Sequence, residues 1–366
     1  MSFPILQFGT SRFLQAHVDL FIDQGFQDGA GKGVIAVAQT TASPDSARRL
    51  SFFNSGRPYT VRVRGLFEGA AIDQAIEVAS IGRGVDANAD WSTLERLFVE
   101  ARWIVSNTGD RGYELNGDDR DAAAIPRSFP AKLAKLLHAR FEARRPAPTL
   151  FPCELIEANG DKLRALVLEV ARGWGLAEAF QRWAAEDCLW VNSLVDRIVS
   201  EPLEPAGAVA EPYALWAVEN RPGLVMPCQH PSVTLTDDLK RYERLKLFIL
   251  NLGHTYLAEG WAARGGARSE TVRLLLADPA TLADLNDLYD QEVLPVFEGI
   301  GLRDAASAYR QSVIERFRNP FLDHYLADIH TNHAAKKQRR FAGLIALGAQ
   351  AGLTIAQPRL SAALAR

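Results

Sequence analysis

The chain has 366 residues, of which 48% are hydrophobic and 23% are charged, and its formal net charge is −3. This length predicts two domains, and the even mixture of acidic and basic residues excludes a surface specialised for nucleic acid or an anionic membrane. The cysteines Cys153, Cys188 and Cys228 are far apart in the sequence, which disfavours a disulfide framework or a structural zinc site. The N-terminus has no signal-peptide pattern, and no apolar run is long enough to span a membrane. We therefore expect a cytoplasmic protein, a monomer or small homo-oligomer, with no nucleic-acid or membrane partner.

The first part of the chain alternates between strand and helix patterns. An apolar run over residues 4–8 ends at Gly9 and is followed by helical periodicity over residues 13–26. Further elements are predicted as buried strands at 33–38, 103–106 and 149–151, a more exposed strand at 59–65, and a basic amphipathic helix at 128–145. A strand, a turn with glycine, a helix and a second strand form the start of a βαβ unit with a parallel sheet.

The pattern changes near residue 202, after which helical periodicity dominates and few strand candidates occur. The predicted helices are residues 237–257, 271–276, 281–297, 305–318 and 322–329. We therefore expect an α/β domain over residues 1–200 and a mostly α-helical substrate and catalytic domain over residues 201–366.

The turn after the first strand reads Gly9-Thr10-Ser11-Arg12-Phe13. A Rossmann-like dinucleotide-binding fold places its phosphate turn here, because glycine lets the backbone approach the pyrophosphate and the helix N-terminus faces it. Ser11 stands at the place of the second glycine of the usual motif, and the third glycine is absent. An ordinary turn between a strand and a helix of another α/β protein therefore stays open as the alternative.

Two other strand ends are candidates for cofactor contact. The second strand ends in Gln39-Thr40-Thr41 without a carboxylate, and Ser43, Arg48 and Arg49 beyond it could accept a 2′-phosphate or simply form a solvated helix face. Asn107 and Thr108 follow a buried strand and either line the nicotinamide side of a cleft or belong to a plain turn. The expected cofactor is NAD or NADP, with NAD favoured.

Residues 244–256 are apolar almost all round if they are helical, which predicts a buried helix. Lys246, Asn251 and His254 fall within an arc of roughly 140° on one side of an α-helix. A buried lysine is costly unless its pKa falls or a ligand pairs with it, and a lysine of lowered pKa can take a hydroxyl proton without zinc. Asn251 could donate to the developing alkoxide, and His254 could orient a second substrate oxygen. The alternative is a lysine that extends to solvent from a helix edge, with Asn251 and His254 satisfied in the core.

The spacing of Lys246, Asn251 and His254 resembles the signature of the polyol-specific long-chain dehydrogenase/reductase (mannitol dehydrogenase) family. Residues 192–198 are similar to the family's Asn-Ser-Met-Val-Asp-Arg-Ile, and the agreement continues in residues 211–216 and 316–320. The resemblance implies that Lys246 is the general base, that Asn251 forms part of the oxyanion hole and that His254 binds substrate. It also implies that Asp196 is a site residue. Asp196 and its neighbour Arg197 either form a structural ion pair or position the substrate.

Within that family the chain is most similar to the tagaturonate reductase and D-mannonate oxidoreductase branch, through residues 128–133, 152–156 and 332–340. Lys336 and Arg340 match basic positions of that branch, so we expect them to bind a substrate carboxylate, the alternative being a solvated basic face. Leu155 stands where the polyol dehydrogenases have a second oxyanion donor, an asparagine.

These residues predict a zinc-independent, NAD(P)-dependent oxidoreductase that interconverts a secondary alcohol and a ketone on a polyol or a hexuronate-type sugar acid. Tagaturonate, fructuronate and mannitol are representative substrates, Lys246 is the general acid/base, and no metal is expected. Two other functions stay open. One is a non-catalytic, nicotinamide-binding sensor of the same fold, which Leu155 favours, and the other is a lyase or isomerase with a lysine base.

Overall fold

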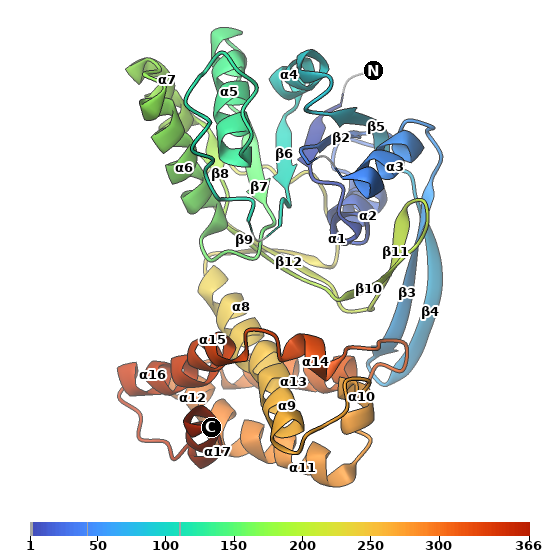
Figure 1. Ribbon diagram of the computed structural model, residues 1–366, viewed down its shortest axis with the longest axis vertical. Coiled ribbons are helices and arrows are strands. Elements are labelled where there is room, and N and C mark those ends of the chain that lie inside the picture. Colours follow the sequence, from blue (N-terminus) through green and yellow to red (C-terminus); the bar gives the residue numbers. More distant parts are fainter. Residues whose placement is uncertain (1–2, 42, 110) are drawn as a thin grey trace. The chain divides into compact units, whose positions relative to one another are not determined.

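The computed structural model describes residues 3–41, 43–109 and 111–366. Its chain divides into two compact units. Unit 1 comprises Met1–Arg62, Ala75–Ala210 and Ala214–Leu239. Unit 2 comprises Val63–Gln74, Glu211–Tyr213 and Lys240–Arg366 (Figure 1). Unit 2 therefore consists of the C-terminal part of the chain, the tip of a β-hairpin (Val63–Gln74) and a short connecting segment (Glu211–Tyr213).

Unit 1 is built around a parallel sheet. Within the described residues its strands run in the order β5-β2-β1-β6-β7-β8, and neighbouring strands are parallel. The strands are β1 (Ile5–Phe8), β2 (Ile35–Gln39), β5 (Ile81–Asp86), β6 (Trp103–Ser106), β7 (Thr149–Pro152) and β8 (Leu189–Trp190). The predicted buried strands are therefore confirmed as β1, β2, β6 and β7. The strand order reverses at β1, which has β2 on one side and β6 on the other, and ligands of such sheets bind at this reversal.

Helices cover both faces of this sheet (Figure 1). They are α1 (Arg12–Gln15), α2 (Val18–Gly25), α3 (Pro44–Phe53), α4 (Trp91–Glu100), α5 (Phe129–Glu142), α6 (Asn159–Gly173), α7 (Glu178–Arg182) and the π-helical η1 (Trp183–Asp187). Phe8 of β1 packs on the face covered by α4 and α5, against the rings of Phe98 and Phe129. Gln7, its neighbour, points to the opposite face and donates a hydrogen bond to Asp19 of α2. Burial on both faces explains why these strands are apolar runs without alternation.

The single helix predicted over residues 13–26 is interrupted at His17, between α1 and α2. The backbone of His17 leaves the helical region, with φ −133° and ψ −97°. Its imidazole forms a hydrogen bond of 3.0 Å with the carbonyl of Leu215. Helical periodicity in the sequence cannot predict this hydrogen bond, because its acceptor is far along the chain.

The part of the chain that the structure describes also forms two smaller sheets, with the strand orders β10-β11-β3-β4 and β13-β12-β9. Their strands are β3 (Tyr59–Phe67), β4 (Ala70–Val78), β9 (Ser193–Asp196), β10 (Val199–Pro202), β11 (Gly207–Ala210), β12 (Leu215–Glu219) and β13 (Val233–Thr236). The exposed strand predicted at residues 59–65 is confirmed as β3. The helical pattern expected from residue 202 onward is wrong for its first part, where β11, β12 and β13 lie. Each of these strands has only four or five residues, too few for alternation to stand out.

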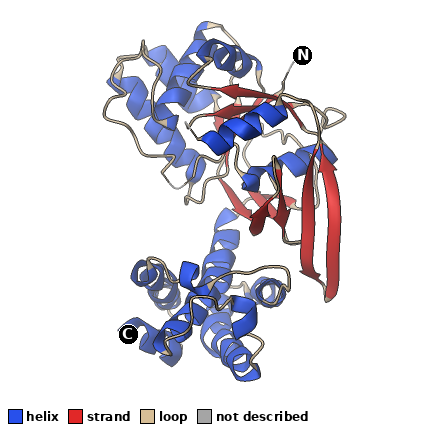
Figure 2. Cartoon of the chain, turned by 45° about the vertical axis from the view of Figure 1, so that its right-hand side comes forward, coloured by secondary structure: helices blue, strands red, loops and turns tan. Residues whose placement is uncertain are grey.

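Unit 2 is mostly helical, as predicted (Figure 2). Its helices are α8 (Leu239–Leu245), α9 (Leu252–Ala263), α10 (Val272–Leu275), α11 (Pro279–Leu288), α12 (Leu294–Gly299), α13 (Arg303–Phe317), α14 (Leu326–Ile329), α15 (His333–Lys337), α16 (Gly343–Gln350) and α17 (Pro358–Ala365). Three π-helical turns join them, η2 (Lys246–Asn251), η3 (Tyr289–Val293) and η4 (Gln338–Ala342). The continuous α-helix expected over residues 237–257 is therefore α8, η2 and α9. In the part of the chain that the structure describes, no helix is long and apolar enough to cross a bilayer.

Candidate functional site

The reversal point of the parallel sheet brings Gly9 and Asn107 together. Gly9 follows β1 and Asn107 follows β6, and these two strands are neighbours. Gly9 has a φ of +114°, and a Cβ atom at this position would lie 2.5 Å from the carbonyl oxygen of Asn107. Any side chain would force the two turns apart, so this turn requires glycine for both its conformation and its space.

Side chains tie three strand ends together at this point. Ser11 Oγ accepts a hydrogen bond from the N–H of Leu14 at 3.2 Å, which caps α1, and donates to Oδ1 of Asn107 at 3.4 Å. Asn107 donates from Nδ2 to the carbonyl of Cys153, directly after β7, at 2.7 Å. The carboxyl ends of β1, β6 and β7 therefore form one connected rim, where a doubly wound sheet binds its ligand.

Glu154, which lies in the 152–156 segment but was not predicted as a site residue, holds Thr108 in this rim. Its buried carboxyl accepts hydrogen bonds from the N–H and the hydroxyl of Thr108, both at 3.0 Å, and from the hydroxyl of Ser106 at 3.1 Å. Burial raises the pKa of Glu154 above its ordinary value. A signal was present in the sequence, since an acidic residue that follows a buried strand needs partners inside the protein.

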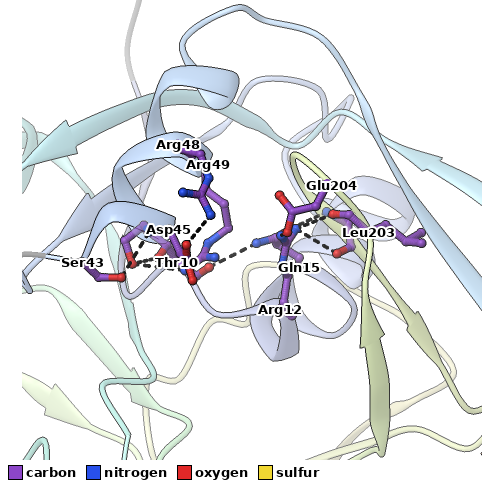
Figure 3. A network of polar contacts seen from close by, with 11 residues as sticks. Thr10, Arg12, Gln15, Ser43, Asp45, Arg48, Arg49, Leu203 and Glu204 are labelled. Atoms are coloured by element: carbon purple, nitrogen blue, oxygen red, sulfur yellow. Dashed lines mark hydrogen bonds and ion pairs between the residues drawn. The ribbon is translucent and has the colours of Figure 1, made fainter.

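The other predicted cofactor residues of unit 1 have different surroundings. Arg12 donates to the carbonyl of Leu203 at 2.6 Å and forms an ion pair with Glu204 at 2.7 Å (Figure 3). Phe13 stacks on a neighbouring imidazole with ring centroids 4.7 Å apart. Thr40 directly follows β2, at the next strand end. Arg12 and Phe13 therefore have contacts inside unit 1 that need no ligand.

A basic cluster with hydroxyl groups lies beside the turn (Figure 3). Arg49 of α3 donates from Nη2 to the hydroxyls of Thr10 and Ser46, at 3.2 and 3.1 Å, and Thr10 donates to Ser46 at 3.0 Å. The Nε atom of Arg49 is buried and has no hydrogen-bond partner among the described residues. Burial and the charge of Arg12 lower the pKa of Arg49. An unsatisfied cationic donor next to Gly9 fits a ligand that carries phosphate.

In unit 2 the three predicted catalytic residues lie on one continuous helical segment. Lys246 is the first residue of η2, Asn251 is its last, and His254 follows in α9. Bonds from residue i to i+5 bring residues five apart nearly into line, so Lys246 and Asn251 lie closer to one face than an α-helix would place them. The arc of roughly 140° applies to a regular α-helix, whereas this segment begins with a π turn. Lys246 and Asn251 are half-buried, and His254 is buried.

Two side chains from distant helices bind carbonyls of this segment. The hydroxyl of Tyr289 donates to the carbonyl of Ile249 at 2.8 Å, and Nη1 of Arg340 donates to the carbonyl of Asn251 at 3.1 Å. Tyr289 is fully buried. Gly253 makes room for it, since a Cβ atom at Gly253 would overlap the Tyr289 hydroxyl. Sequence reasoning selected Arg340 but missed Tyr289 and Gly253.

His254 lies in an aromatic and basic environment. Its ring centroid is 4.3 Å from that of Phe317 and 4.6 Å from that of His324. Burial lowers the pKa of His254 well below its ordinary value, and the nearby charges of His324 and Arg316 add to this effect. His254 is therefore neutral at pH 7. His324, which the sequence did not single out, has a buried Nδ1 atom without a partner among the described residues.

Lys336 and Arg340 also lie near enough to His254 for their charges to lower its pKa further. Lys336 donates to the carbonyl of Ile329 at 2.7 Å, and burial lowers its pKa. Burial lowers the pKa of Arg340 to about 10. Two partly buried cations beside a neutral imidazole favour an anionic ligand, which would offset the cost of burying their charge.

Asp196 and Arg197 belong to unit 1. Asp196 is the last residue of β9, and both side chains are buried. Arg197 donates from Nη1 to the carbonyl of Ala16 at 2.6 Å. Arg197 therefore fixes the chain after β9 to the end of α1.

Two motifs that supported the family resemblance meet in unit 2. Arg316 donates from Nε and Nη2 to the two carboxylate oxygens of Glu211, at 2.9 and 2.8 Å, and both side chains are 2% exposed. Asn319 donates from Nδ2 to the carbonyl of Arg64 at 3.2 Å. Glu211 of the first motif and Arg316 of the second therefore form one buried ion pair.

Comparison with known proteins identifies relatives along most of the chain. A family model described as "Mannitol dehydrogenase Rossmann domain" matches residues 4–225, and "Mannitol dehydrogenase C-terminal domain" matches residues 238–365. The chain is 34% identical over 360 residues to an altronate oxidoreductase of Bacillus subtilis (strain 168), covering 92% of this chain and 73% of that protein. It is 32% identical over 389 residues to an altronate oxidoreductase of Klebsiella pneumoniae (strain 342), covering 99% and 78%.

Two solved structures share the fold. D-sorbitol dehydrogenase in substrate-free form has a TM-score of 0.81 at 20% identity and covers 97% of this chain, with 78% of that chain matched. Pseudomonas fluorescens mannitol 2-dehydrogenase, in a ternary complex with NAD and D-mannitol, has a TM-score of 0.72 at 18% identity, covering 100% and 84%. These likenesses support the fold predicted from the sequence, a Rossmann-like domain followed by a mostly α-helical domain.

Proposed function

The chain belongs to the mannitol dehydrogenase family, and from that premise we propose that it is a nicotinamide-dependent oxidoreductase of sugar acids. The proposed reaction interconverts a secondary alcohol and a ketone on a hexuronate-type substrate. Relatives named altronate oxidoreductase, at 34% and 32% identity, support a sugar acid over a neutral polyol. The observation that carries the proposal is the placement of Lys246, Asn251 and His254 on one segment to which the cation Arg340 is hydrogen-bonded.

Each residue of this segment has a proposed role in proton transfer. Lys246 takes the hydroxyl proton of the substrate during oxidation and returns it during reduction. Asn251 donates a hydrogen bond from its side-chain amide to the same oxygen, whose negative charge grows as the proton leaves. His254, neutral because burial lowers its pKa, forms a hydrogen bond with a neighbouring hydroxyl of the substrate. No metal ion is needed to activate the hydroxyl, because a lysine supplies the base.

Lys336 and Arg340 are proposed to bind the substrate carboxylate. A sugar acid carries this group at the end of its chain, so its position relative to the two cations decides which carbon reaches Lys246. Arg340 presents a planar fork of donors that suits a carboxylate, and Lys336 adds a second charge.

The cofactor is proposed to bind unit 1 as NAD or NADP. The nicotinamide, when bound, accepts or supplies the hydride that leaves or joins the substrate carbon. Gly9, Thr10 and Ser11 line the proposed pyrophosphate turn, and Asn107 and Thr108 line the nicotinamide half. The connected rim formed by these strand ends supports this assignment.

An assay of Lys246→Ala tests the proposal. Wild-type protein should oxidise NADH or NADPH with tagaturonate or fructuronate, and fructose serves as the uncharged comparison. Mannitol, which is already an alcohol, is tested in the opposite direction with NAD or NADP. In Lys246→Ala kcat should fall by about 10² to 10⁴, while cofactor affinity stays the same. Lys240, exposed at the start of α8, gives the matched control Lys240→Ala, which should keep full turnover.

Turnover by Lys246→Ala at the wild-type rate would contradict the mechanism. Cofactor binding without turnover of any substrate by the wild-type protein would contradict the proposed enzyme and support the non-catalytic sensor.

A further inference from the structure

The end of β2 lacks the carboxylate that an NAD site normally places there. An acidic residue at this point holds the adenosine ribose hydroxyls in Rossmann folds that bind NAD. Here Gln39 ends β2, and its amide donates to the carbonyl of Thr41 at 2.6 Å, within its own turn. The next carboxylate along the chain, Asp45, is exposed and forms an ion pair with Arg48. Gln39 keeps a buried Oε1 atom that accepts no hydrogen bond among the described residues, but its neutral amide carries no charge that would repel a phosphate, and Asp45 is paired with Arg48.

The basic groups nearby are unevenly neutralised (Figure 3). Arg12 pairs with Glu204 at 2.7 Å, and Arg48 pairs with Asp45. Arg49 has hydroxyl partners but no ion pair among the described residues, and its Nε atom is buried without a hydrogen bond. Arg49 is therefore a cation of the cluster without a direct ion pair among the described residues, and the charges of Asp45 and Glu204 act on it only from a distance.

A phosphate monoester would match this group. Its oxygens can accept from the guanidinium fork of Arg49 and from the hydroxyls of Thr10 and Ser46, which already lie within hydrogen-bond distance of that fork. Thr10 directly follows Gly9, so a group bound here lies beside the proposed pyrophosphate turn. The position corresponds to the adenosine ribose, at the neighbouring ends of β1 and β2.

We propose that Arg49, with Thr10 and Ser46, binds the 2′-phosphate of the adenosine ribose, so that the protein takes NADP in preference to NAD. This inference rests on the proposed function, because it assumes a nicotinamide dinucleotide on unit 1. The competing assignment for Arg49 is the pyrophosphate, which NAD and NADP share.

Binding of two dinucleotide fragments separates these assignments. Calorimetric titration of the full chain with 2′,5′-ADP and with 5′-ADP measures the contribution of the 2′-phosphate without any turnover. The wild-type protein should bind 2′,5′-ADP at least about tenfold more tightly. Arg49→Gln should reduce this ratio to within about twofold of unity and leave the affinity for 5′-ADP unchanged. Arg49→Lys, which keeps the charge but loses the fork, should give an intermediate ratio.

Two further variants accompany Arg49→Gln. The first is a control, and the second tests another residue of the proposed site. Arg57→Gln removes an exposed arginine just beyond α3 and should keep the wild-type ratio. Ser46→Ala should lower the ratio by about threefold, because it removes one of the two hydroxyl donors. Thermal unfolding of each variant reports whether it is folded.

Equal wild-type affinities for the two fragments would overturn the inference. An equal loss of affinity for 2′,5′-ADP and 5′-ADP in Arg49→Gln would also overturn the inference. That result would assign Arg49 to the pyrophosphate. If only the proposed function is wrong, the result will be different. The protein will still bind 2′,5′-ADP in a way that depends on Arg49, but it will turn over no substrate. Absence of binding by both fragments would overturn the inference together with the proposed cofactor.

Discussion

The hydroxyl of Tyr289 donates a hydrogen bond of 2.8 Å to the main-chain carbonyl of Ile249. Ile249 lies inside the π turn η2, whose first and last residues are Lys246 and Asn251. In a π turn the backbone hydrogen bonds no longer follow the α-helical pattern. Tyr289, which belongs to η3, supplies a hydrogen-bond donor to a carbonyl of this turn. We infer that this bond helps to fix the spacing between Lys246 and Asn251.

Tyr289→Phe should therefore affect both stability and the proposed catalysis. The buried carbonyl of Ile249 loses a donor, which should lower the free energy of unfolding by about 1–3 kcal/mol. Misplacement of Lys246 should lower kcat by about tenfold while KM changes little. Urea unfolding and steady-state kinetics measure the two effects. Tyr256→Phe is the control, since its hydroxyl bonds the exposed Asp284. An unchanged kcat despite lower stability would assign Tyr289 a purely structural role.

Gly253→Ala tests the same relationship from the opposite side. The added methyl group would overlap the hydroxyl of Tyr289, so Tyr289 or α9 must move. We expect a loss of about 1–3 kcal/mol in the free energy of unfolding, measured in urea. Gly260→Ala on the same helix is the matched control, because among the described residues its new Cβ would meet no heavy atom within 4 Å outside its chain neighbours and the backbone of its own helix. It should be neutral or stabilising by about 0.5–1 kcal/mol, and similar effects of both changes would refute the packing argument.

The sequence predicts the features that depend on local pattern. The run before Gly9 predicts β1 because its residues, apart from Gln7, are apolar and end at a glycine. The structure shows why a glycine is needed there, since a Cβ atom would lie 2.5 Å from the carbonyl oxygen of Asn107. The spacing of Lys246 and His254 predicts a shared helical segment, which the structure has. These inferences need no knowledge of residues far along the chain.

Features that depend on distant partners are not predictable in this way. The π turn has the same apolar pattern as an α-helix, and the donor to it, Tyr289, is 40 residues beyond Ile249. Glu154 binds Thr108 from 46 residues away. Glu211 and Arg316 each belong to a recognisable motif, yet only the structure pairs them across 105 residues.

Lys336→Gln tests the proposed recognition of a carboxylate. The amide keeps a hydrogen-bond donor but loses the charge, so kcat/KM for a hexuronate should fall by about 10- to 100-fold. Turnover of an uncharged analogue such as fructose, if present, should change by less than about threefold. The ratio of the two values removes any general effect on the fold. Equal losses for charged and uncharged substrates would mean that Lys336 supports structure only.

Glu211→Gln tests the buried ion pair with Arg316. Both side chains are 2% exposed, so the change leaves a buried guanidinium without its counter-charge. The free energy of unfolding should fall by about 3–5 kcal/mol in urea titration. Glu298→Gln removes the partner of Arg303 in an exposed pair and should cost less than about 1 kcal/mol. Similar costs for the two substitutions would refute the importance of burial.

The buried carboxyl of Asp19 predicts how the stability of unit 1 depends on pH. Asp19 is fully buried, and among the described residues it accepts only long hydrogen bonds, of 3.4 Å, from Gln7 and Tyr59. Burial raises the pKa of Asp19 from 3.8 to about 7. The folded state therefore binds more protons than the unfolded state between these values, and the stability that Asp19 contributes at low pH is lost as pH rises through about 7.

Asp19→Asn should remove this loss, because the amide resembles the protonated carboxyl. The pKa difference corresponds to a loss on the order of 4 kcal/mol between pH 4 and pH 8, so the variant should be more stable than wild type above pH 7. Tryptophan fluorescence in urea reports on unit 1, since Trp261 alone of the seven tryptophans lies in unit 2. Asp28→Asn, at an exposed ion pair with Arg102, should keep the wild-type pH dependence. Parallel pH profiles for Asp19→Asn and wild type would show that the Asp19 carboxyl stays ionised in the folded protein, contrary to the effect expected from its burial.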